Sequence, residues 1–236
     1  MAYDEVLLER RAQIARAARV SEKDATPSIR NLAQTLTSGR AAVVVPVLNA
    51  AFSLWGATES WDAESVAKVT AEFDDAEAPA QALCIGDRHD LLAQASRAAG
   101  SLPLLRADLL LEEHEVFASR ALGADGVLFL ASALGAQLSR CVRAARATHM
   151  LPVVLVTSPE ECSAAQSAGA GAVAFDLRAD VASLFPLIPA RALGVGLLFG
   201  ESSRAELARY EGKLDAVLAV AGAVDPVAAW RRLAEG

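Results

Sequence analysis

Eight short apolar runs alternate with amphipathic stretches along most of this 236-residue chain. The runs consist mainly of Val, Leu and Ala, as buried parallel strands do, and the stretches between them carry apolar residues at helical spacing. The runs predict strands at 42–48, 81–85, 104–109, 126–130, 152–156, 172–176, 195–199 and 216–220. Helix starts between them are marked by Asp62, by Ser158 with Glu161, and by Asp225 before Pro226.

This alternation is typical of βαβ units, and eight units favour a closed (β/α)8 TIM barrel over an open doubly wound sheet. No GxGxxG motif follows the first predicted strand, so a dinucleotide fold is not indicated. Residues 1–40 have the pattern of two helical segments interrupted at Pro27. We therefore expect an α/β fold, with residues 1–236 forming one barrel domain and residues 1–40 an N-terminal helical extension.

The net charge and the spacing of the cysteines limit the kinds of partner and the cellular compartment that we expect for this chain. A net charge of −7 disfavours nucleic acid. No run of 18 apolar residues is present, and the charged first twenty residues lack the apolar centre of a signal peptide, so neither a membrane nor export is expected. Cys84, Cys141 and Cys162 are widely spaced, which indicates no disulfide framework or zinc site and fits a reducing cytoplasm. We expect no metal and no cofactor.

The segment Leu102–Leu134 reads LPLLRADLLLEEHEVFASRALGADGVLFLASAL. It resembles the third strand, third helix and fourth strand of the indole-3-glycerol phosphate synthase family, whose strand reads like LPVLRKDF. Further matches, with gaps, cover nearly the whole chain: GRAAVVVPVLNAAFSLWG is similar to the family's GRPAVIAEIKRASPSKG, AVAFDLR to IIGINNR, GLLFGESSR to VVSESGI, and DAVLAVAGAVDP to DAFLVGEALM. The resemblance implies closure of an anilino-deoxyribulose phosphate onto its aromatic ring, with loss of carbon dioxide and water.

The charged groups that this chemistry requires are replaced here. The lysine of LRKDF, the family's general acid, corresponds to Ala107; the family's EIK corresponds to Pro46, Val47 and Leu48; and the catalytic glutamate on the fifth strand corresponds to Leu155. Family glycines that cradle phosphate correspond to Ser203 and to Val220 with Ala221. The three lysines of the chain, Lys23, Lys68 and Lys213, all lie away from the C-terminal ends of the predicted strands.

Three polar groups remain as candidates for catalysis. Glu201, with Ser202, matches the family's ES pair and has either a functional role or inherited packing. Asp176 replaces the first asparagine of INNR; it either repels the ancestral substrate or is a solvated carboxylate at a strand end. His89 could transfer protons with Asp87 or Asp90 orienting it, although a solvated helix start capped by Asp90 is favoured.

The surroundings of these candidates are predicted to be mainly apolar. We expect Leu48, Ala107 and Leu155 to line the barrel mouth, with Asn49, Trp55, Ser202 and Ser203 as further ligand contacts. Phe52 and Trp55, on the first βα loop, either form a lid that stacks on a planar ligand or fill the pocket. Arg106 and Asp108 should face the helices as a structural ion pair, since side chains alternate along a strand. Arg178 is expected to fix a loop, and His114 to lie on a helix surface.

These observations favour a divergent barrel of this family that no longer performs the ring closure. Its expected role is that of a noncatalytic binding or scaffold protein linked to tryptophan or aromatic metabolism. Its partner would be a small aromatic or phosphorylated metabolite, or another protein of that metabolism. The alternatives are an enzyme with changed chemistry in an apolar pocket, and residual carboxy-lyase activity.

Overall fold

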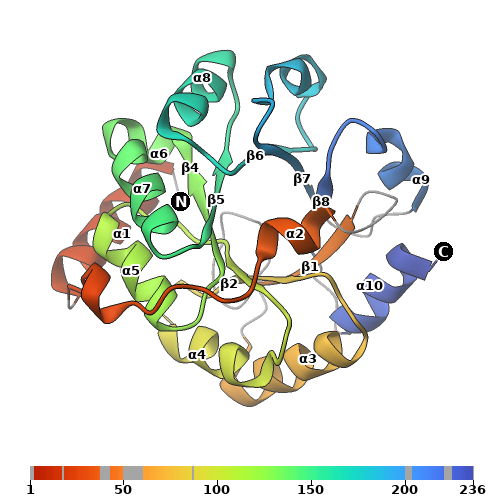
Figure 1. Cartoon of the computed structure of the whole chain (residues 1–236), viewed down its shortest axis with the longest axis horizontal. Helices are drawn as coiled ribbons and strands as arrows, with labels where there is room; N and C mark the ends of the chain where they lie inside the picture. Colours follow the sequence, from red (N-terminus) through yellow and green to blue (C-terminus); the bar gives the residue numbers. More distant parts are fainter. Residues whose placement is uncertain are drawn as a thin grey trace.

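The strands of this chain close into a barrel (Figure 1). The structure, a computed structural model, describes residues 3–17, 19–37, 43–49, 61–86, 88–199, 204–220 and 225–235. Its parallel strands are β1 (Val43–Asn49), β2 (Gln81–Cys84), β3 (Leu104–Arg106), β4 (Gly126–Leu130), β5 (Leu151–Leu155), β6 (Ala172–Asp176), β7 (Leu193–Phe199) and β8 (Ala216–Val220). They pair in sequence order, and β8 pairs with β1. The predicted fold class is confirmed.

The third strand ends earlier than predicted, at Arg106 instead of Leu109. The reason is the side chain of Asp108, whose carboxylate accepts hydrogen bonds from the backbone N–H groups of Ile85, at 3.3 Å, and Gly86, at 3.0 Å. These donors, just beyond β2, therefore bind a side chain instead of the neighbouring backbone.

Most of the helices surround the strands, whereas α2 lies across one end of the barrel (Figure 1). They are α1 (Tyr3–Arg16), α2 (Leu32–Thr37), α3 (Ala63–Asp75), α4 (His89–Ala98), α5 (Glu113–Ala121), α6 (Ala131–Leu134), α7 (Leu138–Ala147), α8 (Pro159–Ala168), α9 (Arg204–Leu207) and α10 (Pro226–Glu235), with short 3-10 turns η1 (Glu22–Asp24), η3 (Gly135–Gln137), η4 (Ala182–Leu187) and η5 (Ala208–Tyr210). Within the described residues, no helix is both long and apolar enough to cross a membrane.

The predicted helix starts are confirmed. Asp62 accepts a hydrogen bond from the N–H of Ser65, Ser158 from that of Glu161, and Asp225 from that of Ala228. Each side chain satisfies a backbone donor that has no partner within its own helix. The Glu161 carboxylate binds the backbone N–H of Thr157 at 2.6 Å, one residue before the expected capping-box partner.

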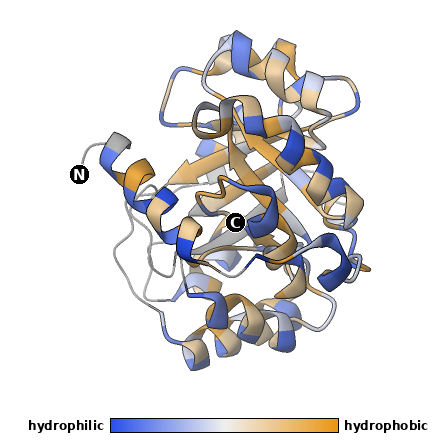
Figure 2. Ribbon diagram, turned by 90° about the vertical axis from the view of Figure 1, so that its left-hand side faces the viewer, coloured by the Kyte–Doolittle hydropathy of each residue, from blue (hydrophilic) through white to orange (hydrophobic). Residues whose placement is uncertain are grey.

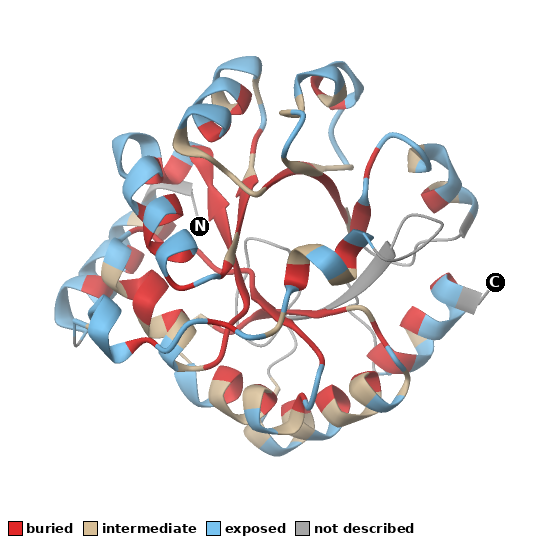
Figure 3. Ribbon diagram, viewed as in Figure 1, coloured by how far each residue is buried: buried red, intermediate tan, exposed pale blue. Residues whose placement is uncertain are grey.

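Alternating strand residues build two apolar layers. Strands β2 to β8 are mostly buried where the structure describes their side chains (Figure 3), and apolar residues line the inner side of the helices while polar residues face outward (Figure 2). On β3 and just beyond it, Leu105 and Ala107 belong to the cluster inside the barrel, whereas Leu104 belongs to the layer beneath the helices. Because successive side chains of a strand point to opposite faces, only every second residue can face the inside of the barrel.

The two helices of the N-terminal extension lie at opposite ends of the barrel. Leu32 and Leu36 of α2 join the inner cluster from the N-terminal end of the strands, where a Cβ on Gly126 would collide with the Leu32 side chain. Val6 and Ile14 of α1 join the same cluster together with Leu109 and Leu111, residues that follow β3. The first helix therefore lies over the C-terminal ends of β3 and β4, the end that carries active sites in barrels of this kind.

Candidate functional site

The mouth of the barrel is apolar beside β3 and β5. Ala107 is 4% exposed and packs in the inner cluster with Leu109 and Leu130. Leu155, at the end of β5, is partly buried against the same cluster. The structure thus brings together two positions that sequence reasoning assigned to the mouth. Neither side chain can donate or accept a proton, and neither can bind an anion.

The chain's three lysines all lie among the described residues, and all are remote from this mouth. Lys68 is on the outer face of α3, with its Nζ 4.0 Å from a carboxylate oxygen of Glu72. Lys213 precedes β8, at the N-terminal end of the strands, and Lys23 is within η1. A lysine acid or Schiff base at the C-terminal ends of the strands is therefore excluded.

A charged pair lies at the ends of β6 and β7. The Arg178 guanidinium donates from Nε to Oδ1 of Asp176 at 2.9 Å and from Nη2 to Oδ2 at 2.6 Å. The backbone N–H of Arg178 also donates to Oδ1, at 3.0 Å. The same guanidinium carbon lies 3.8 Å from the ring centroid of Phe199, the last residue of β7. This bidentate pairing and the cation–π contact hold the three side chains in one arrangement.

This arrangement determines the charge state of Asp176. Partial burial raises the pKa of its carboxyl, but the hydrogen bonds and charge of Arg178 outweigh burial and leave the pKa below the ordinary value. The hydrogen bonds to Asp176 likewise raise the pKa of Arg178. Asp176 is therefore ionised near neutral pH, with its charge balanced by Arg178. That state suits electrostatic positioning of a ligand better than proton donation. As predicted, Arg178 fixes the local loop.

His89 is the first residue of α4 and is exposed. The expected capping role of Asp90 is wrong: Arg88 occupies the N-cap, and Asp90 lies in the first helical turn. Its carboxylate instead accepts two hydrogen bonds from Arg88, at 3.0 and 2.8 Å, because the guanidinium two residues earlier reaches it directly. Asp87 lies outside the described residues.

The predicted ion pair of Arg106 and Asp108 is confirmed. Both side chains are at most 2% exposed, and Nε of Arg106 lies 2.9 Å from Oδ2 of Asp108. Arg106 also donates to the hydroxyl of Ser119 on α5 and to the carbonyl of Gly86. The pair faces the helices, so it supports the barrel wall instead of reaching the mouth.

The other predicted ligand contacts fall outside the described part of the chain. Trp55, Phe52, Glu201, Ser202 and Ser203 are among the residues not described. Leu48 and Asn49 are described only as backbone of β1, where they pair with Leu83 and Cys84 of β2. These residues remain predictions.

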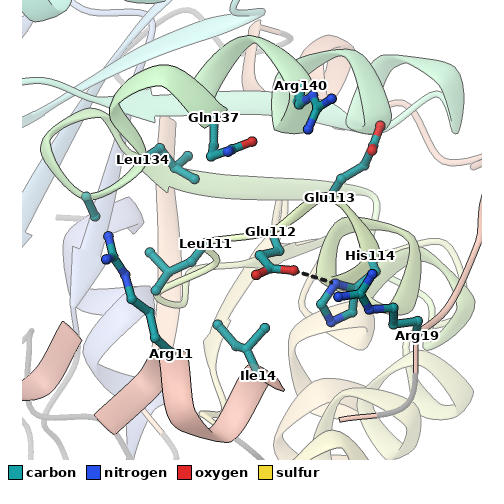
Figure 4. Close-up of a pocket in the computed structure, with 11 residues that line it drawn as sticks. Arg11, Ile14, Arg19, Leu111, Glu112, Glu113, His114, Leu134, Gln137 and Arg140 are labelled. Carbon is teal, nitrogen blue, oxygen red and sulfur yellow. Dashed lines mark ion pairs between the residues drawn. The ribbon is translucent and has the colours of Figure 1, made fainter. Parts of the chain in front are cut away.

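Sequence reasoning missed a cavity beneath α1. It has a volume of about 610 Å³, and α1, the start of α5, and the segment α6–α7 line it (Figure 4). His114, expected on a helix surface, lines this cavity and is only 11% exposed, because α1 covers the start of α5. The only signal in the sequence was the arginine-rich run RRAQIARAAR in the extension. Among the described residues, no group of three His, Cys, Asp or Glu side chains could hold a metal ion.

By sequence, the chain is similar to several proteins named indole-3-glycerol phosphate synthase. The indole-3-glycerol phosphate synthase of Verminephrobacter eiseniae is 30% identical over 168 residues, which cover 62% of this chain and 61% of the relative. That of Carboxydothermus hydrogenoformans is 29% identical over 147 residues, 59% of this chain and 54% of the relative. Indole-3-glycerol phosphate synthase 2 of Streptomyces coelicolor is 38% identical over 94 residues, 39% of this chain and 36% of the relative. The chain thus spans between about a third and three fifths of the length of these relatives.

No protein-family model matches the chain. Among solved structures, that of a 3-hexulose-6-phosphate synthase superposes with a TM-score of 0.57 at 19% identity, covering 83% of this chain and 98% of the other. At that identity the likeness concerns the fold alone.

Proposed function

We propose that this protein is a divergent barrel of the indole-3-glycerol phosphate synthase type that does not catalyse ring closure and decarboxylation, and that acts as a binding or scaffold protein in aromatic metabolism. The sequence similarity to proteins of that name supports the lineage. A cytoplasmic location is part of the proposal, and the three buried cysteines, which form no disulfide, are compatible with a reducing compartment.

The observation that carries the proposal is the environment of Ala107. Its methyl group occupies an inward position directly after β3 and is buried among leucines. The family resemblance implies a lysine at this position as general acid. General acid catalysis needs a titratable group within hydrogen-bond reach of the reacting oxygen, and an alanine supplies none. Because the chain's lysines are all remote from the mouth, none of them can take over this role.

Turnover of the anilino-deoxyribulose phosphate tests the proposal directly. The purified protein should release no indole product by fluorescence, while the Streptomyces coelicolor relative, assayed in parallel, serves as the positive control. A rate close to that of the control would overturn the proposal. An Ala107→Lys variant tests whether the loss of this one group explains the inactivity. It should remain inactive, because Pro46, Leu48 and Leu155 still replace the other charged groups that the family resemblance implies.

Binding is tested by a thermal-shift screen with aromatic and phosphorylated metabolites. A ligand that binds only the folded state at about 100 times its Kd adds about 2.7 kcal/mol to the free energy of unfolding, which raises the melting temperature. If a metabolite raises the melting temperature of the native protein but not that of an Arg178→Met variant, it binds beside Asp176 and Phe199. The absence of any hit, combined with co-purification of an enzyme of aromatic metabolism, would support the scaffold role.

The alternative is an enzyme with changed chemistry. The observation that favours it is the polar pair of Asp176 and Arg178 beside an apolar mouth, since an ordered ion pair can position a charged substrate. His89 and Glu201 are the further candidates for this chemistry. Conversion of any metabolite identified by the screen, followed by mass spectrometry of the mixture, would support this alternative over the noncatalytic role.

A further inference from the structure

The cavity beneath α1 has an apolar floor and an open, charged rim. Ile14 of α1, Leu111 before α5, and Ala133 with Leu134 of α6 form the floor. All four are buried. The volume of about 610 Å³ lies within the range of pockets that hold small metabolites.

Three arginines from different segments line the rim. Arg11 extends from α1, Arg19 from the segment that follows it, and Arg140 from α7 (Figure 4). All three are exposed, and none of them forms an ion pair or hydrogen bond with any residue that the structure describes. Three like charges around one cavity repel each other, and an anion between them would relieve this repulsion. Guanidinium groups bind carboxylate and phosphate oxygens in bidentate geometry.

The two acidic residues of the rim, Glu112 and Glu113, form no ion pair with these arginines, so three guanidinium groups and two carboxylates line the cavity. The Glu112 carboxylate lies 3.2 Å from Nδ1 of His114. Glu113 forms no ion pair with any described residue. Nε2 of His114 is buried without a hydrogen-bond partner in the described chain. A polar ligand group that reached this atom would remove the cost of leaving it unsatisfied.

From this arrangement we propose that the cavity beneath α1 binds a small organic oxyanion, a phosphate monoester or carboxylate with an apolar body. The body packs on Ile14, Leu111 and Leu134, while Arg11, Arg19 and Arg140 hold the charged end. Neither Ala107 nor Leu155 lines this cavity. The proposal therefore stands independently of the function proposed for the mouth.

Calorimetric titration with four probes tests this specificity. Phenyl phosphate and benzoate carry both an oxyanion and an apolar ring, inorganic phosphate lacks the ring, and phenol lacks the charge. We expect phenyl phosphate or benzoate to bind more tightly than both single-feature probes, and the stronger of the two identifies the oxyanion that the site prefers. Equal binding of phenol and the charged ring compounds, or no binding of either ring anion, would overturn the proposal.

Variants of the arginines locate the binding. Arg11→Gln and Arg140→Gln should each weaken the preferred probe about tenfold, because each removes a charge-assisted hydrogen bond. The matched controls are Arg16→Gln on α1 and Arg143→Gln on α7, exposed arginines of the same helices that do not line the cavity. Circular dichroism verifies that all four variants fold. Loss of affinity in the controls as large as in the cavity variants would show nonspecific charge attraction and contradict the site.

Hydrogen exchange gives a second readout that does not depend on affinity. The ligand would bridge α1 to α5 and α7, so the amides of α1 should exchange more slowly when the preferred probe is bound. Those of α3, on another side of the barrel, should be unchanged. Equal protection of α1 and α3, or none in α1, would contradict binding beneath α1.

Discussion

The guanidinium of Arg10 on α1 lies 2.6 Å from a carboxylate oxygen of Glu115 on α5, and both side chains are more than nine-tenths buried. Nε of Arg10 also donates to the carbonyl of Leu109, at 3.1 Å. The other oxygen of Glu115 accepts from the backbone N–H groups of Leu111 and Glu112. A single buried carboxylate therefore joins the extension to the segment between β3 and α5, and it places α1 over the mouth.

We expect Glu115→Gln to lower the free energy of unfolding by about 3 kcal/mol, because it leaves the Arg10 charge buried without its partner. Urea denaturation measures this change. The control is Glu72→Gln, which removes the exposed partner of Lys68 and should change stability by less than about 0.5 kcal/mol. Similar losses in the two variants would mean that the buried pair does not secure α1.

Arg178→Met should raise the pKa of Asp176. With the guanidinium gone, burial remains and pushes the pKa upward. In the native protein the folded pKa lies below the unfolded value, so the stability from this pair is fully present above the unfolded value and is lost as pH falls through the folded pKa. NMR titration of the Asp176 carboxyl carbon measures the shift, with Arg16→Met as the control. An unchanged pKa in Arg178→Met would refute the role assigned to this pair.

The three thiols should resist labelling by a disulfide reagent at pH 8 in the native state. Burial, together with the smaller effect of the nearby carboxylates of Glu115, Glu113 and Glu112, raises the pKa of Cys141 to about 12. Burial also raises the pKa of Cys162. Since the reactive species is the thiolate, both groups stay protonated and inert, and Cys84 is enclosed in the barrel. Denaturant should release three reactive thiols; rapid labelling without it would contradict this packing.

Gly126→Ala should destabilise the protein by about 1–3 kcal/mol, because the added methyl group collides with Leu32 of α2. A double-mutant cycle with Leu32→Ala measures the contact. In the Leu32→Ala background, Gly126→Ala should lower the free energy of unfolding by much less, because the added methyl group no longer meets the leucine side chain. Strict additivity of the two changes would show that α2 does not close this end of the barrel as described.

The number of strands was predictable, and so, to within a few residues, were the positions at which each strand begins and ends, because buried parallel strands have a recognisable composition and length. Within each strand the alternation of side chains also predicted that Ala107 faces inward while Arg106 and Asp108 face the helices, as observed. The early end of β3 was not predictable. It depends on Asp108 binding the backbone beyond β2, a contact between residues more than twenty positions apart.

The site was predictable only in part. Sequence reasoning placed Ala107 and Leu155 at one apolar mouth, as the structure has them. It assigned Asp90 a cap that Arg88 displaces, and it left His114 on a surface that α1 covers. It also considered Asp176 as an unbalanced charge, whereas Arg178 pairs with it and stacks on Phe199.

By itself, the sequence determined the repeating units, the helix starts at Asp62, Ser158 and Asp225, and the inward or outward direction of residues on β3, since each depends on neighbours a few positions away. Only the tertiary structure decided where the extension docks. Arg10 and Glu115 are 105 residues apart, and no local pattern relates them. Their pairing, the burial of His114 and the arginine-lined cavity all follow from the packing of α1 on the barrel, whose free energy comes from contacts that exist only once the strands have closed.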